Sequence, residues 1–255
     1  MFLAIDCGNT SVEFGFFEDH ELCHIYRAKT TTKKTSDAYA IDLSSFLTNK
    51  NIQKESVQAI LISSVVPSFN ETLREVCQSV FGLEPFLIGP GFPSGVRINT
   101  DNPKEVGGDL IADCAGAKAL FGGPAIICDL GTATKIILMG PDGSFEGCTI
   151  APGLAISLSA LVGKAALLGE VDIRIPEKKL GKNTADCISS SLTYGTSYAI
   201  KGLADEIEKE AGYPCKRIIT GGYSKLLLPL LGEFTYASHL ALRGIYAIYE
   251  RKSKQ

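Results

Sequence analysis

Apolar and polar positions along the chain predict two α/β halves with the same order of elements. In the first half, alternating apolar residues over 2–18 predict a strand, a tight turn and a second strand. A continuous apolar run at 58–66 predicts a strand that is covered on both faces. Further strands are expected at 22–27, 85–88, 125–129, 135–140 and 215–220.

Helical spacing and capping residues predict the helices between these strands. Ser36 is expected to cap a helix that ends near residue 49, and Ser68 with Glu71 has the pattern of a capping box. Thr184 is expected to cap a long helical stretch that ends near residue 210. Residues 239–252 predict an amphipathic helix with a basic end, as suits a helix C-terminus.

One short motif follows the first strand of each half. Residues 2–11 (FLAIDCGNTS) and 125–134 (AIICDLGTAT) both run from apolar residues into Asp, one further residue, Gly and hydroxyl side chains. Glycine lets a backbone approach a ligand, and successive N–H groups in such a turn bind anions. Because an aspartate repels phosphate, it is useful here only with a cation between them. Two such turns predict a site for a metal–polyphosphate complex, whereas one alone is typical of an ordinary hairpin with a capping Asp.

Composition narrows the classes of function. The 255 residues carry a net charge of −3 and no basic stripe, so we expect no nucleic-acid partner. Eight cysteines without a C-x-x-C pair, several of them in apolar strands, are typical of free thiols in a reducing compartment. No secretory signal or membrane-spanning run is recognised, so a soluble cytoplasmic protein is expected. The P-loop, nucleophile-elbow and dinucleotide-binding motifs do not fit.

Six motifs of the chain resemble those of the type III pantothenate kinases, which belong to the acetate kinase, sugar kinase, Hsp70 and actin superfamily. Six matches occur in family order from end to end of the chain. They are D-x-G-N-T at 6–10, N-P-x-E-V-G-x-D at 102–109, D-x-G-T-A-T at 129–134, A-P-G-L-x-x-S-x-x-A-L at 151–161, G-K-N-T at 181–184 and T-G-G at 220–222. The resemblance implies an α/β fold of two duplicated ribonuclease H-like domains, 1–120 and 121–255, each an actin-like ATPase half, with a cleft between them.

The resemblance also implies a reaction and residue roles. ATP would phosphorylate pantothenate, the first step toward coenzyme A, with Mg²⁺ on the nucleotide and a monovalent cation, potassium or ammonium, held by Asp129. Asp109 would accept the proton of the attacking hydroxyl. The alternative is that Asp109 is only an acid at a helix start, stabilised by the helix dipole and without a catalytic part. Members of the family are homodimers with the substrate pocket at the subunit interface. The implied ATP-binding residues are Asp6, Cys7, Gly8, Asn9, Thr10, Ser11, Val12, Glu13, Thr132, Gly221 and Gly222. The implied substrate-binding residues are Gly107, Gly108, Asp109, Leu110 and Thr184.

Two positions depart from the family pattern. Leu110 stands where an arginine is usual in the family. Leucine has neither the positive charge nor the N–H donors of a guanidinium group. Lys135 follows the second turn where a threonine is common, and we hypothesise that its charge partly replaces the potassium ion. Three interpretations stay open: an active pantothenate kinase, a catalytically weak or silent relative with a binding or regulatory role, and a kinase of another small hydroxyl substrate such as a sugar. Relatives of the family have been named as accessory transcription factors.

Overall fold

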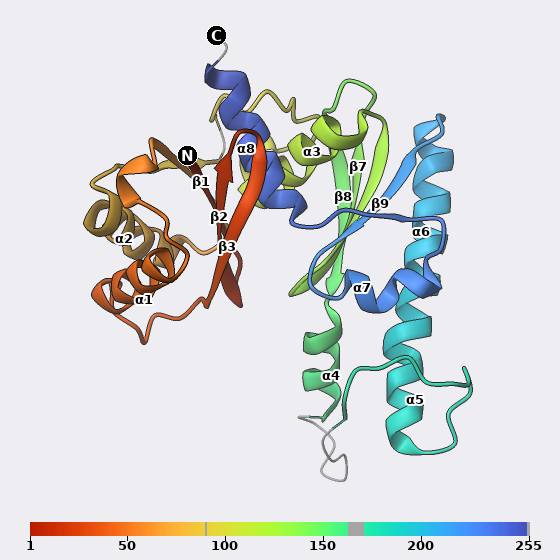
Figure 1. Ribbon diagram of the computed structural model, residues 1–255. Helices are drawn as coiled ribbons and strands as arrows, with labels where there is room; N and C mark the ends of the chain where they lie inside the picture. The colour runs from red at the N-terminus through yellow and green to blue at the C-terminus, as the bar shows by residue number, and fades with distance from the viewer. Residues whose placement is uncertain (90, 163–170, 254–255) are drawn as a thin grey trace. The chain divides into compact units, whose positions relative to one another are not determined.

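The computed structural model describes residues 1–89, 91–162 and 171–253 (Figure 1). Contacts between residues divide the chain into two compact units, one of residues 1–120 with 240–255 and the other of residues 121–239. Each unit is built around a five-stranded mixed sheet.

The sheet of the first unit has the strand order β3-β2-β1-β4-β5. β1, β2 and β3 are antiparallel, and β4 and β5 run parallel to β1. The strands are β1 Phe2–Cys7, β2 Ser11–Glu18, β3 Glu21–Lys29, β4 Ala59–Ser64 and β5 Phe86–Ile88. The helices of this unit are α1 Ser36–Asn49, α2 Asn70–Phe81, α3 Gly108–Phe121, whose last residue falls in the second unit, and α8 Leu240–Ser253.

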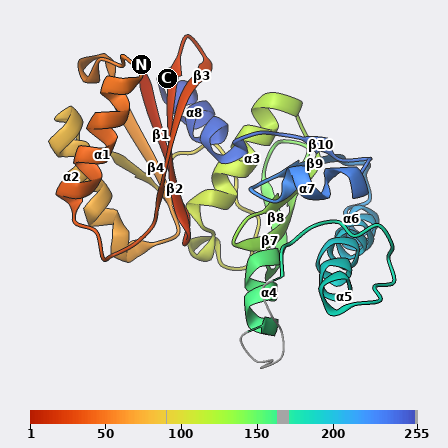
Figure 2. The same cartoon turned by 60° about the horizontal axis from the view of Figure 1, so that its bottom comes forward.

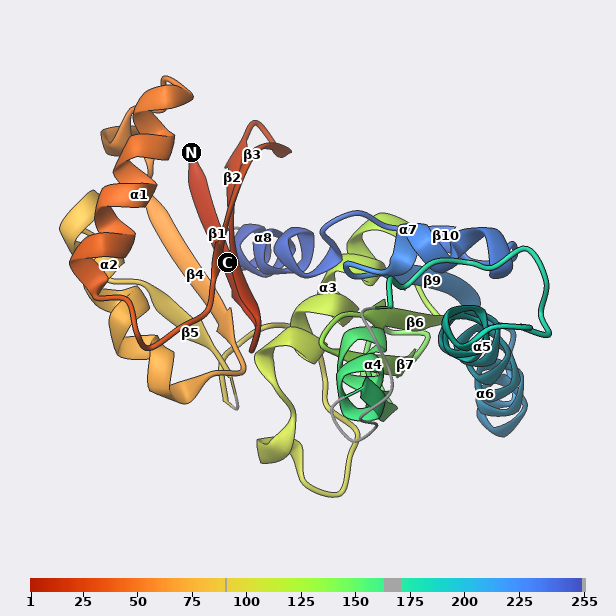
Figure 3. The ribbon, with the colours of Figure 1, turned by 90° about the horizontal axis from the view of Figure 1, so that it is seen from below.

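Helices cover both faces of this sheet. α1 and α2 lie on one face, where alternate residues of β2 such as Phe14 and Phe16 join a buried apolar core (Figures 1 and 3). α8 covers the other face, where Tyr249 stacks on Phe2 with ring centroids 4.2 Å apart and Tyr246 stacks on Phe17 at 4.4 Å. The strict alternation of side chains in a strand thus supplies two cores from one sheet.

The C-terminal helix belongs to the first unit, whereas the sequence pattern assigned residues 121–255 to the second half. α8 packs on the sheet of the first unit, in contact with β1, β2 and β4, and it also approaches α3 closely. A Cβ atom on Gly244 would lie 1.7 Å from the carbonyl oxygen of Ala112, and one on Gly116 would lie 2.5 Å from that of Leu240. Two glycines therefore let the two helix backbones touch, which hydrophobic periodicity alone does not reveal.

The second unit repeats the strand order of the first. Its sheet reads β8-β7-β6-β9-β10, with β6, β7 and β8 antiparallel and β9 and β10 parallel to β6. The strands are β6 Ala125–Leu130, β7 Ala133–Met139, β8 Phe145–Pro152, β9 Lys216–Thr220 and β10 Thr235–Tyr236. The helices that are wholly in this unit are α4 Leu154–Val162, α5 Thr184–Ser190, α6 Thr196–Ala211 and α7 Ser224–Leu227. The duplication inferred from the two acid turns therefore extends to the whole sheet.

Three details at helix ends differ from the sequence-based predictions. Thr35, not Ser36, caps α1, because its side chain accepts the N–H of Ala38 at 3.3 Å. The capping box at Ser68 does not form, since that residue lies in a 3₁₀ turn, Pro67–Phe69, which precedes α2. Asn183 caps α5, accepting the N–H of Asp186 at 2.9 Å, so Thr184 is the first helical residue.

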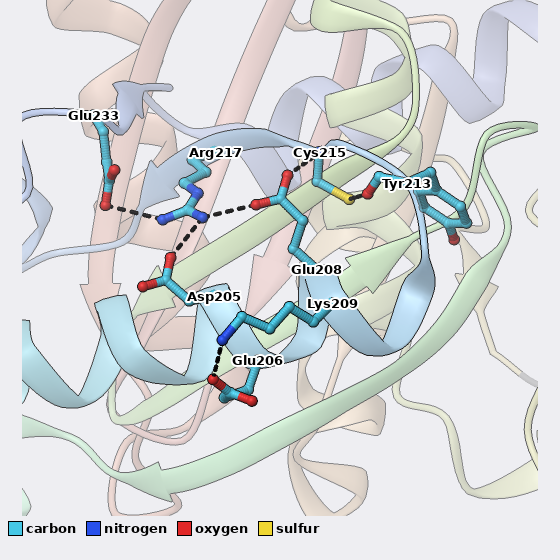
Figure 4. A network of polar contacts seen from close by, with 8 residues as sticks. All are labelled: Asp205, Glu206, Glu208, Lys209, Tyr213, Cys215, Arg217 and Glu233. Carbon is cyan, nitrogen blue, oxygen red and sulfur yellow. Dashed lines mark hydrogen bonds and ion pairs between the residues drawn. The ribbon is translucent and has the colours of Figure 1, made fainter.

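A network around Arg217 ties β9 to its neighbours in the second unit (Figure 4). The guanidinium contacts Asp205 at 2.7 Å and Glu208 at 2.8 Å, both on α6, and Glu233 at 3.0 Å just before β10. Glu208 also accepts the backbone N–H of Cys215 at 2.6 Å. This N–H, followed by Arg217, holds the pKa of Glu208 below its ordinary value. The network fixes the start of the strand whose other end carries Gly221.

Replacing Arg217 by methionine is expected to destabilise the protein by about 1–3 kcal/mol, because three carboxylates lose their common partner. Glu208 has a lowered pKa in the folded state, so its stabilisation is present at neutral pH and is lost as the pH falls from the ordinary value of 4.5. Urea unfolding at neutral and acid pH measures both effects, and the variant should lose less stability on acidification than the parent. Lys209→Met, which removes an exposed charge 2.6 Å from Glu206, is the control. Equal unfolding midpoints for the parent and Arg217→Met would contradict this account.

All eight cysteines are free thiols. Burial raises the pKa of Cys77 to about 12 and also raises that of Cys128. Among the described helices, none combines the length and the apolar run needed to cross a membrane.

Candidate active site

The first acid turn lies at the carboxyl end of β1. Its backbone is closed by the N–H of Gly8, which donates to the carbonyl of Ser11 at 3.0 Å. Thr30, just after β3, braces the turn, because its hydroxyl donates to the carbonyl of Gly8 at 2.7 Å and its N–H to that of Thr10 at 3.1 Å. Asn9 and Thr10 are exposed at the tip. The turn thus presents polar groups to solvent from a fixed backbone.

Not every residue of this predicted phosphate loop offers its side chain to a ligand. Cys7 and Val12 are buried in the core of the first unit, so only their backbone atoms can face a bound molecule. Asp6, Ser11 and Glu13 are half-buried. Side-chain alternation in β1 and β2 produces this division.

A row of side chains crosses the sheet through Asp6. Register places Asp6 opposite Glu13 on β2 and beside Ser63 on β4, while Glu13 lies opposite Arg27 on β3 and forms an ion pair with it. Ser63 is fully buried, and its hydroxyl has no hydrogen-bond partner within the described residues. Sequence analysis did not single out Ser63; its signal was a pair of serines that ends an otherwise apolar strand.

Two glycines bring the start of α3 against this row. A Cβ atom on Gly108 would lie 2.7 Å from the carbonyl oxygen of Ile88 and 3.4 Å from Ser63 Oγ. A Cβ atom on Gly107 would lie 2.5 Å from Asp109 Oδ1. Within the first unit, the structure therefore brings Asp109, in the first turn of α3, to the sheet end that carries Asp6. The N-terminus of a helix also favours a carboxylate at this position.

The neighbouring residue of the predicted substrate segment does not face outward. Leu110 is only 8% exposed and contributes to the core. Its side chain therefore offers a ligand little surface, in contrast to the half-buried carboxylate of Asp109.

The second acid turn has a different set of neighbours. Asp129 lies opposite Lys135 on β7 and beside Thr220 on β9. Lys135 Nζ is 2.6 Å from Asp129 Oδ2, and the two side chains are 13% and 16% exposed, respectively. In the matching row of the first unit, Glu13 occupies the place that Lys135 has here.

Glycines again permit the close packing at Asp129. Gly221 has a φ of +90°, and a Cβ atom on it would lie 2.5 Å from Asp129 Oδ1 and 2.6 Å from the backbone nitrogen of Leu130. Gly153 donates its N–H to the carbonyl of Thr132 at 3.0 Å. The loop after β9 therefore packs against the Asp129 carboxylate, and the loop after β8 is bonded to the turn that follows it. Gly222 is exposed beside them.

Thr184 lies elsewhere in the second unit. It is exposed at the start of α5, which continues through Ser191–Gly195 into α6, and Figure 1 shows this end of the helix pointing away from the sheet. The structure does not bring Thr184 to the Asp129 turn within this unit.

Two units with one strand order and an acid turn after the first strand of each define an α/β protein of the actin and sugar kinase class. Solved structures agree with this fold. A putative Baf family transcriptional activator from Campylobacter jejuni is similar with a TM-score of 0.61 at 19% identity, covering 99% of this chain and 100% of that one. A putative 2-dehydro-3-deoxygalactonokinase from Sinorhizobium meliloti has a TM-score of 0.57 at 13% identity, covering 98% of this chain and 96% of that one.

Sequence comparison identifies the family within this class. The sequence profile of the type III pantothenate kinases matches residues 2–206. A relative from Halalkalibacterium halodurans described as a type III pantothenate kinase is 36% identical over 98% of this chain and 99% of its own length. The chain belongs to the type III pantothenate kinase family.

Proposed function

We propose that this chain binds ATP through its two acid turns and uses Asp109 as the general base for the reaction of its family. That reaction is transfer of the γ-phosphoryl group of ATP to pantothenate in coenzyme A biosynthesis, so the chain is an ATP-dependent phosphotransferase. The observation that carries the residue assignment is the placement of Asp109 and Asp6 at one end of the first sheet.

In the proposed site, residues 6–13 hold the phosphates in the first unit. Backbone N–H groups of the turn and the exposed side chains of Asn9 and Thr10 supply hydrogen-bond donors. In the second unit, Thr132 contacts the phosphates, and Gly221 and Gly222 lie against the adenosine. Glycine suits that contact because it has no side chain to keep the nucleoside from the backbone.

Asp109 accepts the proton of the attacking hydroxyl in this proposal. Phosphoryl transfer depends mainly on positioning and charge neutralisation, and one base aligned with the nucleophile is enough. α3 holds the carboxylate at its first turn, and Gly108 lets the start of this helix pack against Ile88 and Ser63. Leu110 takes part only through its backbone, because its side chain is buried. Thr184 is retained as a proposed pantothenate contact.

The first unit fits a nucleotide-bound Mg²⁺. Asp6 lies opposite Glu13, which also forms an ion pair with Arg27, and Ser63 adds a buried hydroxyl without a partner in the described chain. Oxygen donors of this kind suit Mg²⁺, which neutralises phosphate charge when bound. In this proposal the ion arrives with the nucleotide.

The second unit does not fit a bare monovalent cation at Asp129. The Oδ2 atom of this carboxylate already carries the Lys135 ammonium at 2.6 Å. A potassium or ammonium ion at the same oxygen would face a like charge.

We also propose that the enzyme is a homodimer formed through α4 and the edge strand β8. α4 is apolar but has only Leu154 buried, and Figures 1 and 2 show it projecting from the end of β8. Exposed fractions are 44% for Ile156, 48% for Leu161 and 67% for Ile150. Exposed large apolar side chains on one helix and the strand before it support an interaction site there.

Replacing Leu161 by aspartate is expected to convert the dimer to a monomer, because it buries a charge in an apolar interface. Sedimentation velocity over a range of concentrations measures the change. Ile41→Asp on α1, at a residue that is 66% exposed in the first unit, is the control and should remain dimeric. A parent protein that is monomeric at every concentration would refute the dimer.

A cytoplasmic location is proposed because the chain keeps eight free thiols. The catalytically silent alternative is favoured only by the buried Leu110, in the place of a family arginine. A coupled ADP-release assay with ATP, Mg²⁺ and either pantothenate or a panel of sugars decides among these functions. We expect turnover with pantothenate and none with sugars. Turnover with a sugar but not with pantothenate, or no turnover with any acceptor, would refute the assignment.

A further inference from the structure

The two units carry opposite charges at equivalent places beside their acid turns. In the first unit Asp6 lies opposite Glu13, and in the second Asp129 lies opposite Lys135. The strand order is the same, so β7 presents Lys135 from the place where β2 presents Glu13. The register of the sheet, and not a chance surface encounter, therefore sets the ion pair.

The Asp129 carboxylate is held from two sides. Lys135 Nζ lies 2.6 Å from Oδ2, and the backbone at Gly221 is packed so closely that an added Cβ would lie 2.5 Å from Oδ1. Both charged side chains are at most 16% exposed. A pair this sheltered is screened less by solvent ions than a surface pair is.

Charge decides what else this place can hold. One carboxylate is neutralised by one positive charge, and the ammonium group supplies it without a binding equilibrium. A second monovalent cation would be repelled by that ammonium and would share an oxygen that is already bound.

We propose that Lys135 Nζ is a built-in monovalent cation of the nucleotide site, so that the enzyme works without added potassium or ammonium. This inference rests on the proposed function, because it assumes that nucleotide phosphates lie near Asp129. Lys135 is then a positioning residue, which holds Asp129 and contributes positive charge to the phosphate region.

The first test uses the parent protein in the ADP-release assay, with potassium chloride exchanged for choline chloride at constant ionic strength. We expect kcat and the KM for ATP to stay within about twofold in the two salts. Activity that requires potassium would overturn the inference and leave the proposed function intact. Inactivity in every salt would overturn the proposed function instead.

Variants at Lys135 give the second test. Lys135→Met and Lys135→Thr both remove the charge, and threonine also suits a strand. In choline chloride we expect each variant to lose at least about tenfold in kcat/KM for ATP, because the site loses one charged contact. In potassium chloride we expect kcat/KM for ATP to recover, because the ion replaces the lost charge. Lys209→Met, which removes an exposed lysine on α6, should behave like the parent. Variants whose activity is equal in the two salts would contradict the inference.

A third readout does not depend on turnover. With a non-hydrolysable ATP analogue present, potassium should raise the thermal midpoint of the Lys135 variants and not that of the parent, because only a bound ion stabilises the folded state. A rise in the parent equal to that in the variants would show that a cation binds beside the lysine and would refute the proposal.

Discussion

Replacing Asp109 by asparagine is expected to lower kcat for pantothenate phosphorylation by about 10²–10⁴-fold, the usual contribution of a general base. Asparagine keeps the size of the side chain and can still accept hydrogen bonds at the start of α3, but it cannot take a proton from the substrate hydroxyl. The helix should therefore persist, and the KM for ATP should change little. The coupled ADP-release assay measures both constants.

A matched control lies eight residues earlier in the same segment. Asp101 is exposed, and Asp101→Asn removes an equal charge without touching α3. We expect it to keep parental activity. An Asp109→Asn variant as active as Asp101→Asn, or one that loses activity only through unfolding, would support the alternative in which Asp109 merely stabilises the helix start.

Replacing Gly244 by alanine is expected to destabilise the protein by about 3 kcal/mol or more, at the upper end of the usual cost of overpacking. The new Cβ would lie 1.7 Å from the carbonyl oxygen of Ala112 and 2.6 Å from its carbonyl carbon. Both are backbone atoms of α3, so α8 must move away, and the stacks of Tyr246 and Tyr249 on β1 and β2 must move with it. Thermal unfolding followed by circular dichroism measures the loss.

The same substitution in another helix isolates the steric effect. Gly202 lies in α6, and a Cβ atom there meets nothing within 4 Å. Gly202→Ala should stabilise the protein by up to about 1 kcal/mol, because alanine favours a helix. If both variants shifted the thermal midpoint in the same direction by similar amounts, the proposed contact between α3 and α8 would be wrong.

Most strands of the two sheets could be predicted from sequence because their signals are local, whereas β8 and β10 were not predicted. Apolar runs, alternation and the repeated Asp-x-Gly turn each reside in a few consecutive residues, and the structure confirms the strands they predict. Membership of the actin and sugar kinase class followed from the order of the motifs. Asp109 was expected near the start of a helix, but the predicted start at residues 102–103 is a separate 3₁₀ turn, and α3 begins at Gly108.

Other features depend on contacts that only the structure shows. The assignment of α8 to the first unit depends on its packing against β1, β2 and β4 and on its close approach to α3 at Gly244. The shift of the cap from Thr184 to Asn183 depends on one hydrogen bond. The pairing of Lys135 with Asp129 became definite only with the register of β6 and β7. Ser63 was missed because a serine in an apolar strand resembles ordinary core sequence.

The central claim is that this chain places the phosphoryl group on pantothenate with Asp109 as base. Direct identification of the product tests it: ³¹P NMR of a mixture of ATP, Mg²⁺, pantothenate and the parent protein, beside an identical mixture with Asp109→Asn. The account predicts a phosphomonoester signal that grows with ADP in the parent mixture and is absent, over the same time, from the variant mixture. ADP with inorganic phosphate and no phosphomonoester, or equal phosphomonoester in both mixtures, would contradict it.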